Sequence, residues 1–547
     1  MDWVTPQDSA ALVKKPYLSS AFIYSNCCIV IIDIGRINAN IENIVLINIF
    51  DLNNFASVFK KYTLKMRKHV LVRHCGISLL IISALMFIST VISFFDGSDR
   101  SSLALLISTI VTLLTGLFPV IYTKPVNYIY ANEGYTIVLL AWIISCLFGA
   151  LPFLIYGGQF TLVNSLFESV SGFTTTGASI LNDIEALPDG IQFWRIASAW
   201  IGGIGVVLLI TLAIPDDRNG QVILVRSETS SLARGYFQGG KRGFVRMMML
   251  TYTSITLISI ISLKLAGMDW FDALLHGMSA CSTCGFSNKN SSVAFFDNPI
   301  IETVLIVSML SGAVNFTLLY STIMPGRRKR YYILKSEVFR VFIMLLAIAI
   351  VIMTLNLKAG NIYGSLGESL RQSAFQTVSI ATTTGFATAD TNVWPVFSIG
   401  LLIVCSLICG CAGSTSGGIK IDRIVLVWKG IRQNVHQVRD PFLVTSNRMD
   451  GRLRKTGEIS QAQLFILMYF GFIFIGAELN VGFGMDLRSG ISAAIACMGN
   501  VGPGFGEVGS MGNYAALPNT LKLSSMVLML AGRLEIYPLL LAFRRRF

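Results

Sequence analysis

Four short tracts of small residues, each ending in a glycine, carry the chemistry that this sequence suggests. They read Thr175-Thr176-Gly177, Thr283-Cys284-Gly285, Thr383-Thr384-Gly385 and Asn500-Val501-Gly502, and their glycines are 108, 100 and 117 residues apart. A dehydrated cation needs oxygen atoms in place of its hydration shell, and rings of backbone carbonyls from four loops supply them in potassium channels. Turning successive carbonyls the same way requires conformations that glycine adopts at little cost. The tracts therefore predict a potassium-binding filter, in which threonine hydroxyls add oxygen without adding charge.

The surroundings of the tracts separate this interpretation from simple helix packing. Small residues also let membrane helices approach closely, and a single Thr-Thr-Gly would favour that explanation. Here all four tracts lie between two long apolar runs. Three of them also follow a phenylalanine beside an acid or amide, at Phe167-Glu168, Phe271-Asp272 and Phe375-Gln376. Four tracts in register favour one pore built from four repeats.

The stretch before each glycine is too short to cross a membrane. Residues 162–173 would form about 18 Å of helix, roughly half of a 30 Å hydrocarbon core. The tract that follows cannot face lipid, because each unpaired N–H or C=O group would cost several kcal/mol there. We therefore expect a half-helix and then an extended loop in each repeat, with the loop lining a water-accessible cavity. Each half-helix would point the partially negative end of its dipole toward the axis and favour a cation.

The composition places these repeats in a membrane. Apolar residues make up 53% of the 547 residues and charged residues only 13%, which is about half the charged share of a soluble domain. Ten runs are long enough to span, at roughly 20 residues per crossing. They lie near 77–95, 102–122, 135–156, 193–214, 247–266, 299–323, 337–356, 393–428, 463–482 and 519–543. The predicted fold class is an all-α polytopic membrane protein with four helix–pore-loop–helix repeats around one pseudo-fourfold pore.

The runs and tracts also predict the boundaries along the chain. Residues 1–65 do not match the rest and lack a signal peptide, and residues 1–75 are expected to form a poorly ordered N-terminal extension. A transmembrane hairpin is expected at 76–123, outside the repeats. The pore repeats are expected at 124–215, 216–325, 326–432 and 433–547, and such repetition implies a pseudo-symmetric assembly.

The net charge of +13 indicates membrane topology rather than nucleic-acid binding. The stretches 58–76 and 325–336 and the C-terminal Arg544-Arg545-Arg546 are basic, whereas 157–192 has four acidic residues and no lysine or arginine. Basic and acidic connections alternate, as the positive-inside rule requires. We therefore expect a multi-pass protein of the cytoplasmic (inner) membrane, with both ends of the ten-helix body in the cytoplasm.

One apolar run, 393–428, is too long for a simple crossing and is rich in glycine at its centre. Gly410, Gly413, Gly417 and Gly418 would each cost roughly 1 kcal/mol relative to alanine inside a helix, so local unwinding is expected. Close packing of small residues is the alternative. A phosphate-binding loop is excluded, because Lys420 is displaced by one position, no Ser or Thr follows it and no strand precedes it.

Several charged residues lie within the apolar runs. Arg533 is in the middle of the last run, where a charge costs about 2.5–3.5 kcal/mol, so it should face water or a partner. Arg195, Lys264 and Lys522 lie near the ends of their runs and are expected to extend toward the membrane surface. Glu478 and Glu535 should each pair with a base that the sequence does not identify.

Together the motifs resemble those of the TrkH/KtrB subunits of bacterial potassium uptake systems, in the Trk/Ktr/HKT superfamily. The matching segments are Ser171–Gly177, Trp200–Gly205, Gly410–Lys420, Asn500–Gly504 and Gly532–Ile536, and the resemblance covers about residues 70–547. It implies a pseudo-fourfold pore in each subunit and a homodimer. It also implies a cytoplasmic nucleotide-binding regulatory partner of the Rossmann type, so a nucleotide is expected on that partner only.

The resemblance also implies roles for particular residues. In that superfamily a glycine at the filter position of all four repeats goes with potassium selectivity, whereas serine in the first repeat goes with sodium-preferring plant relatives. Cys284 departs from the pattern, but coordination would use its backbone carbonyl. The arginine that matches Arg533 lies in the pore beneath the filter. The implied gating loop, also below the filter, comprises Gly410, Gly413, Ser414, Thr415, Ser416, Gly417, Gly418 and Lys420.

These observations predict potassium uptake through a gated, potassium-selective pore driven by the membrane potential. The alternative is a potassium symporter coupled to protons or sodium, which is less favoured because the filter tracts contain no acidic or basic residue. An enzyme is disfavoured, since the chain has no phosphate-binding loop or metal-ligand cluster, and the lone pair Cys281 and Cys284 favours a structural role. No covalently bound cofactor is expected, and potassium at the filter is the only metal.

Overall fold

The structure is a computed structural model that describes residues 67–126, 129–205, 241–323, 332–440, 448–454 and 456–542. The contacts within the chain separate a unit that begins at Lys68 from the residues before it, and the description below concerns that unit. Residues 1–66 of the expected N-terminal extension lie outside the described residues.

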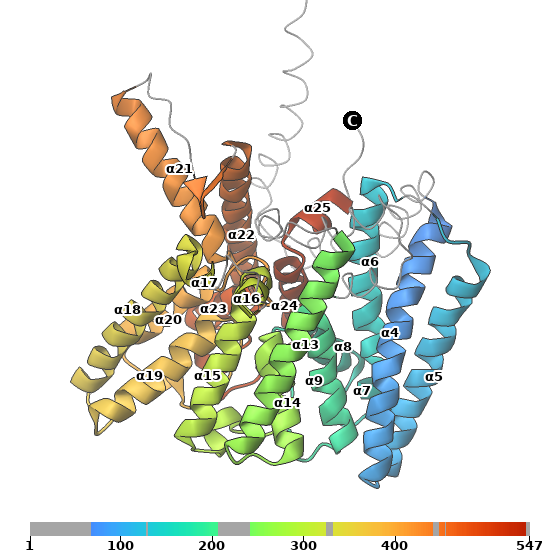
Figure 1. Ribbon diagram of the computed structural model, residues 1–547. Helices are drawn as coiled ribbons and strands as arrows, with labels where there is room; N and C mark the ends of the chain where they lie inside the picture. The colour runs from blue at the N-terminus through green and yellow to red at the C-terminus, as the bar shows by residue number, and fades with distance from the viewer. Residues whose placement is uncertain are drawn as a thin grey trace, which may run out of the picture. The chain divides into compact units, whose positions relative to one another are not determined.

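A helical hairpin begins the unit. Helix α4 (Lys68–Phe95) packs against α5 (Asp99–Tyr122) along its length (Figure 1). The two helices approach closely where two glycines face each other, since a Cβ at Gly76 would lie 2.7 Å from the carbonyl oxygen of Gly116. Because α4 begins at Lys68, residues 68–75 are helical and belong to the hairpin rather than to the expected extension.

Four times after the hairpin, a long helix is followed by a short one that ends at a filter tract. The long helices are α6 (Ala131–Gly149) with its continuation α7 (Leu151–Tyr156), α13 (Lys241–Leu265), α18 (Glu337–Ala359) and α22 (Thr456–Gly482). The short helices are α8 (Leu162–Phe173), α14 (Trp270–Ser282), α19 (Leu366–Ala381) and α23 (Leu487–Gly499). Three of the short helices begin with a side-chain cap, from Thr161, Ser365 and Asp486. The first short helix has the predicted bounds, 162–173.

A second helix follows each filter tract, and within the described residues three of these second helices are broken; the chain after α9 lies outside the described residues beyond residue 205. They are α9 (Asp189–Ile204), α15 (Pro299–Ala313) with α16 (Phe316–Ile323), α20 (Val396–Ile408) with α21 (Ile421–Arg439), and α24 (Asn519–Arg533) with α25 (Tyr537–Ala542). The chain bends by 109° between α15 and α16. The break between α20 and α21 coincides with the glycines that predicted unwinding.

Six of the described helices are long and apolar enough to cross a membrane alone, and the bent pair α15–α16 makes up to seven. The ten predicted runs divide differently because the runs 393–428 and 519–543 are each split into two helices. Only the first part of the run 193–214 lies within the described residues.

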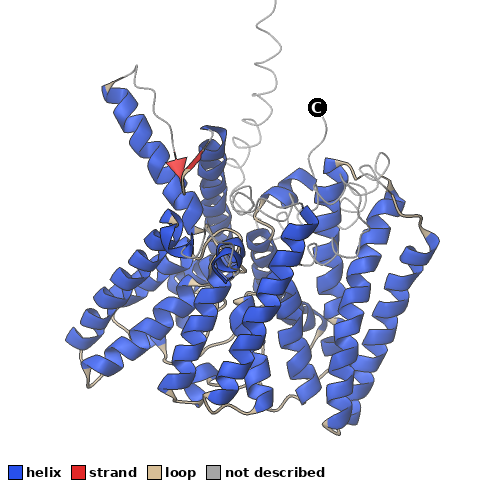
Figure 2. Ribbon diagram, viewed as in Figure 1, coloured by secondary structure: helices blue, strands red, loops and turns tan. Residues whose placement is uncertain are grey.

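The predicted helical membrane fold is confirmed, and the described residues contain one minor exception. Strands β1 (Arg448–Met449) and β2 (Arg452–Leu453) pair antiparallel as a two-residue ladder (Figure 2). The remaining elements are the short helix α17 (Tyr332–Lys335) and three 3₁₀ turns, at Ser292–Phe295, Thr391–Val393 and Gly506–Val508. Fully buried aromatic side chains lie on the short helices or directly after a tract, among them Phe167, Phe173, Phe286 and Phe375.

Candidate functional site

The four predicted tracts come together as a closed ring. A Cβ atom added to any of the four glycines would overlap a backbone carbonyl oxygen of the next repeat. The pairs run from Gly177 to Cys284, from Gly285 to Thr384, from Gly385 to Val501 and from Gly502 back to Thr176. Each repeat therefore contacts the following one through the same atoms, and the fourth repeat contacts the first. Segments that are hundreds of residues apart in sequence thus surround one axis.

The backbone of each tract has the same unusual shape in all four repeats. The glycines have φ between +78° and +94°. The residues two positions earlier, Thr175, Thr283, Thr383 and Asn500, also have positive φ, between +53° and +59°. Positive φ is uncommon for a residue with a side chain and is found where surrounding structure enforces it. The recurrence of this alternation in four different sequences indicates that the ring itself imposes it.

Hydrogen bonds orient the carbonyl groups of the tracts. In the first repeat the N–H groups of Thr175 and Thr176 donate to Gly172 O and Ser171 O in the last turn of α8, at 2.8 and 2.9 Å. The corresponding residues of the other three repeats donate to the ends of α14, α19 and α23 in the same way. Because the N–H and C=O of one peptide unit point in opposite directions, the carbonyl oxygens point away from the helix ends. The eight tract residues other than the glycines are at most 1% exposed, so the surrounding chain encloses the tracts.

A polar cavity of about 130 Å³ lies where the four tracts continue past their glycines. All four filter glycines line it, together with the segments 178–184, 286–292 and 508–514. We call this cavity the vestibule. Asn290 links two of its walls, because its amide donates to Asp183 Oδ1 at 2.9 Å. That hydrogen bond lowers the pKa of Asp183, so the carboxylate stays charged beside the vestibule.

The residue nine positions before each filter glycine braces the chain that follows the glycine in three repeats. Glu168 accepts hydrogen bonds from Ser179 Oγ at 3.0 Å and from Ile180 N at 3.1 Å. In the second repeat this position is His276, whose Nε2 lies 3.0 Å from Ser287 Oγ. Gln376 contacts Ala389 in the third repeat. The sequence-based pairing of Asp272 with Glu168 and Gln376 was therefore out of register, and the spacing from the glycine would have identified His276.

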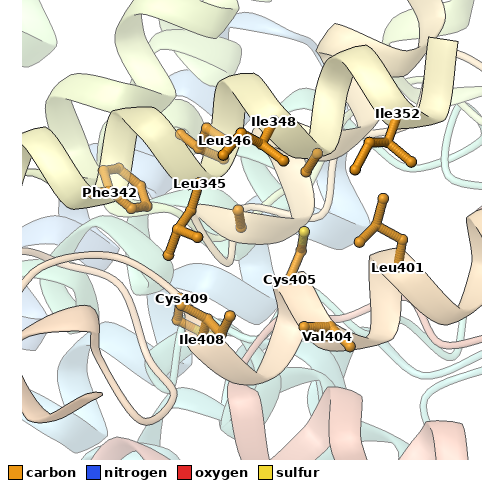
Figure 3. Close-up of a pocket in the computed structure, with 12 residues that line it drawn as sticks. Phe342, Leu345, Leu346, Ile348, Ile352, Leu401, Val404, Cys405, Ile408 and Cys409 are labelled. Atoms are coloured by element: carbon orange, nitrogen blue, oxygen red, sulfur yellow. The ribbon is translucent and has the colours of Figure 1, made fainter. Parts of the chain in front are cut away.

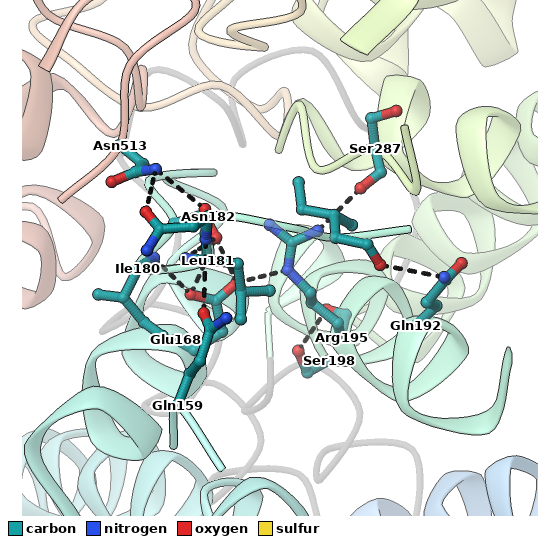
Figure 4. Close-up of polar contacts among 12 residues, drawn as sticks. Gln159, Glu168, Ile180, Leu181, Asn182, Gln192, Arg195, Ser198, Ser287 and Asn513 are labelled. Atoms are coloured by element: carbon teal, nitrogen blue, oxygen red, sulfur yellow. Dashed lines mark hydrogen bonds and ion pairs between the residues drawn. The ribbon is translucent and has the colours of Figure 1, made fainter. Parts of the chain in front are cut away.

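A buried ion pair holds the first of these braces. Arg195, on α9, donates through Nε to Glu168 and through Nη1 to Ser287 O at 2.8 Å (Figure 4). Its guanidinium also stacks on the ring of Phe286 at 3.7 Å. Arg195 is 2% exposed, so the prediction that it extends toward the membrane surface was wrong. It neutralises Glu168 and joins the first repeat to the second.

Lys522 differs from its prediction in the same way. The residue is 4% exposed. Its Nζ donates to Asn164 Oδ1 at 3.0 Å and to Ala515 O at 2.9 Å. These bonds join the fourth repeat to the first, beside the bonds from Asn513 to Leu181 and Asn182 (Figure 4).

The predicted gating loop lies against the opposite end of the ring from the vestibule. Thr283 Oγ1 is 3.3 Å from Thr415 Oγ1, and Gly417 N donates to Thr383 Oγ1 at 3.0 Å. A Cβ at Gly417 would also overlap Gly499 O, directly before Asn500. The loop thus contacts the starts of the second, third and fourth tracts.

The other residues of the loop determine its shape. Gly413 and Gly418 have φ of +81° and +72°, and Lys420 has φ of +71°. Ser414 Oγ lies 2.7 Å from Ser416 Oγ. A Cβ at Gly410 would be 2.8 Å from Ala313 O. These glycines therefore serve turns and close approaches rather than helix packing.

The break between α15 and α16 holds the loop from the side. Asn315 donates through Nδ2 to Ala412 O at 2.5 Å, and Phe316 N donates to Gly413 O at 3.1 Å. Thr415 Oγ1 donates to Gly312 O at 2.9 Å. The sequence-based interpretation missed this break. An asparagine shortly after Gly312, within a long apolar run, is the signal that would have identified it.

Arg533 connects the loop to the first repeat. Its Nη1 donates to Thr415 O at 2.5 Å, and its Nη2 donates to Gly202 O and Gly203 O at 2.6 and 2.8 Å. The guanidinium is half-buried on the loop side of the ring. With the loop on three tracts and Arg533 bonded to the end of α9, all four repeats are joined on this side.

Glu535 is the centre of a second ion cluster at the end of the loop. It forms an ion pair with Lys420 Nζ at 3.1 Å and another with Arg423. Arg423 also lies over the ring of Phe465 at 4.0 Å. Both Glu535 and Ile536 have positive φ, which marks the break between α24 and α25. The basic partner that the sequence left unidentified for Glu535 is therefore a pair of residues, Lys420 and Arg423.

The profile of one protein family matches most of the chain. It is described as TrkH, cation transport protein, and it matches residues 102–546. This chain belongs to the TrkH family. The resemblance drawn from the filter, loop and arginine motifs is confirmed at the level of the family.

Curated relatives and a solved structure agree with this assignment of the TrkH-family chain. The Trk system potassium uptake protein TrkH of Salmonella typhimurium is 34% identical over 420 residues, which cover 76% of this chain and 86% of that protein. The Trk system potassium uptake protein TrkG of Escherichia coli is 32% identical over 423 residues, covering 75% and 84%. The crystal structure of the potassium transporter TrkH from Vibrio parahaemolyticus superposes with a TM-score of 0.79 at 29% identity. The superposition covers 88% of this chain and 100% of the chain in that crystal structure.

Proposed function

We propose that this chain takes up potassium across the cytoplasmic membrane through a gated, potassium-selective pore whose filter is the ring of four tracts. One observation supports this proposal most strongly: each filter glycine lies against a carbonyl oxygen of the next repeat, and the fourth repeat contacts the first in the same way. Such a ring presents backbone oxygens to a dehydrated cation from four sides, as selectivity filters do. The filter residues are the twelve of the four tracts, from Thr175 to Gly502.

The choice of potassium rests on the relatives and on the four glycines together. Relatives of TrkH, TrkG and TrkI type are named as potassium uptake proteins. Serine at the first filter position, which goes with sodium preference in the superfamily, is replaced here by Gly177. A potential of 100 mV supplies about 2.3 kcal/mol per charge, enough to concentrate potassium nearly fiftyfold without another driving ion.

The loop and Arg533 form the gate in this proposal. They lie on the side of the ring opposite the vestibule and are hydrogen-bonded to one another through Thr415. A cation that has passed the filter meets the positive charge of Arg533 there. Opening requires the loop to leave the starts of the tracts, which breaks the bonds of Thr415, Gly417 and Arg533 in one movement.

The same proposal includes a homodimer and a cytoplasmic, Rossmann-type nucleotide-binding partner, as the family resemblance implies. Helix α21 supports a partner surface, because it carries exposed apolar side chains at helical spacing among basic residues. These are Trp428, Ile431, Val435 and Val438. A nucleotide would bind the partner and act on the loop through α21, which begins where the loop ends.

Cation flux into proteoliposomes containing the purified protein tests the proposal. We expect potassium and rubidium to enter much faster than sodium under an imposed potential, with no gradient of protons. Equal rates for potassium and sodium would contradict the filter assignment. Flux that appears only with a proton or sodium gradient would instead establish the symporter, the alternative that this proposal replaces.

A further inference from the structure

A second cavity, separate from the vestibule, lies between α18 and α20 in the third repeat (Figure 3). Its volume is about 120 Å³. The α18 side is formed by Phe342, Leu345, Leu346, Ile348, Ala349 and Ile352, and Figure 3 shows Leu401, Val404, Cys405, Ile408 and Cys409 facing them from α20 and its end. Ala381, the last residue of the half-helix α19, completes the lining. We call this cavity the side pocket.

The mouth of the side pocket opens on the apolar outer surface of α18, a helix long enough to cross a membrane. Helix α18 is the most apolar of the six single spans. Ile348, Ile352 and Val404 line the pocket and are 47%, 38% and 47% exposed. Exposed apolar side chains on a membrane span contact lipid tails. The interior of the pocket is different, because Leu346, Ala349 and Cys405 are at most 8% exposed.

Water is a poor occupant of such a space. A buried water needs two to four polar partners, and the lining offers only the thiols of Cys405 and Cys409, the second of which donates to Ser406 O at 2.7 Å. An empty pocket forfeits dispersion contacts on every lining atom. An engineered apolar cavity of roughly 150 Å³ admits benzene, so a space of this size accepts part of a hydrocarbon chain but not a lipid headgroup.

We propose that the side pocket binds the end of a lipid acyl chain that enters between α18 and α20. Lipid tails are the molecules present at its mouth, and they match its wholly apolar lining. The chain end would touch Cys409, where α20 stops with φ of +58° and the gating loop begins. It would also touch Ala381, two residues before the third filter tract. The bound chain therefore supports the elements that flank both the loop and the filter.

Photocrosslinking of the full chain in vesicles tests this site. The vesicles contain phosphatidylethanolamine and phosphatidylglycerol, with a fraction of the phosphatidylglycerol carrying a diazirine at the end of one acyl chain. After irradiation, we expect peptide mass spectrometry to find adducts on the buried residues Leu346 and Cys405. The variant Ala349→Phe fills the pocket and should reduce those adducts at least fivefold. Val351→Phe is the matched control on the same helix, since Val351 is 55% exposed and outside the pocket.

Two results would overturn the proposal. One is adducts confined to outward-facing side chains outside the pocket, such as Val351 and Leu355, which would show that lipid only covers the surface or that a second copy of the chain closes the mouth. The other is an unchanged yield on Leu346 and Cys405 in Ala349→Phe. If that variant does not fold, Val404→Trp at the mouth replaces it with the same expected loss. Because the measurement records binding alone, its outcome is independent of whether the filter selects potassium.

Discussion

At the scale of the residue, the filter glycines combine a positive φ with a lack of space for a Cβ, and two variants separate these requirements. Gly177 has φ of +78° and would place a Cβ against Cys284 O, whereas Gly158 has φ of +71° and no atom within 4 Å of its Cβ position. We expect Gly177→Ala to reduce rubidium uptake at least tenfold or to lose selectivity over sodium. Gly158→Ala carries the same backbone strain and should stay within about twofold of wild type. Equal losses in both variants would assign the effect to backbone strain.

Arg533 is the second residue whose removal should change flux, in the opposite direction. At an effective dielectric near 20, a charge about 8 Å from a cation opposes it by about 2 kcal/mol, which corresponds to a rate change of up to roughly thirtyfold. We expect Arg533→Ala to raise rubidium uptake in proteoliposomes. The control Arg533→Lys keeps the charge but lacks the planar guanidinium that donates to both Thr415 O and Gly202 O. Its uptake should therefore lie between that of the wild type and that of Arg533→Ala. Unchanged uptake in Arg533→Ala at normal expression would refute the gate role.

Single residues also show how far the sequence could be interpreted. The four glycines were predictable because a bare-cation filter demands a backbone that only glycine adopts cheaply. The role of His276 was not predictable from the sequence. A histidine, an acid and an amide make the equivalent contact in three repeats, so no shared residue type marks the position. Arg195 and Lys522 were misplaced for a related reason. A lysine or arginine near the end of an apolar run can either reach water or pair inside the protein. The position alone does not distinguish these two cases.

At the scale of the element, the gating loop is held at its end by the Glu535 cluster. Removing the charge of Glu535 leaves Lys420 and Arg423, which are 10% and 7% exposed, without their carboxylate. Loss of one partner of a buried ion pair costs about 3–5 kcal/mol. We therefore expect Glu535→Gln to lower the Tm of the purified protein by several degrees and to raise uptake, because the loop loses its anchor to α24.

The matched control is a charge pair outside this cluster. Asp297 lies 2.8 Å from Arg371 and is 83% exposed, and Arg371 keeps a second carboxylate in Glu302. Exposed pairs of this kind contribute about 0–1 kcal/mol, so Asp297→Asn should leave both Tm and uptake unchanged. A Tm in Glu535→Gln that equals that of Asp297→Asn would show that the cluster does not anchor the loop.

The elements also differ in how well the sequence predicted them. The half-helix at 162–173 and the break at Gly410–Gly418 followed from length and from the cost of glycine in a helix. The breaks at Asn315 and Glu535 did not, because each run is apolar enough to be one span. Those helices break because tertiary contacts take over their free backbone groups: Gly312 O accepts from Thr415 N, and Phe316 N donates to Gly413 O. Such partners are remote in sequence and carry no local signal.

At the scale of the whole molecule, an uncoupled pore and a symporter differ in the potential at which current reverses. In a planar bilayer with a tenfold potassium gradient, we expect the reversal potential of the purified protein to be about 59 mV. Imposing a pH or sodium gradient at constant potassium is the control, and it should leave this value unchanged. A shift that follows either gradient would establish coupling to that ion.

The last pair of the ring has a consequence for how the chain is made. Asn500 donates to Thr176 Oγ1 and Tyr514 N donates to Ser179 O, contacts that join residues more than 300 positions apart. At a translation rate of about 5–20 residues per second, the first tract waits roughly 16–65 s for its partner to leave the ribosome. Until then, the half-helix α8 and its tract are in the membrane without the neighbour that Gly502 provides. A nascent chain that stalls before residue 500 therefore lacks a closed ring, and the proposed ion path can form only when synthesis is almost complete.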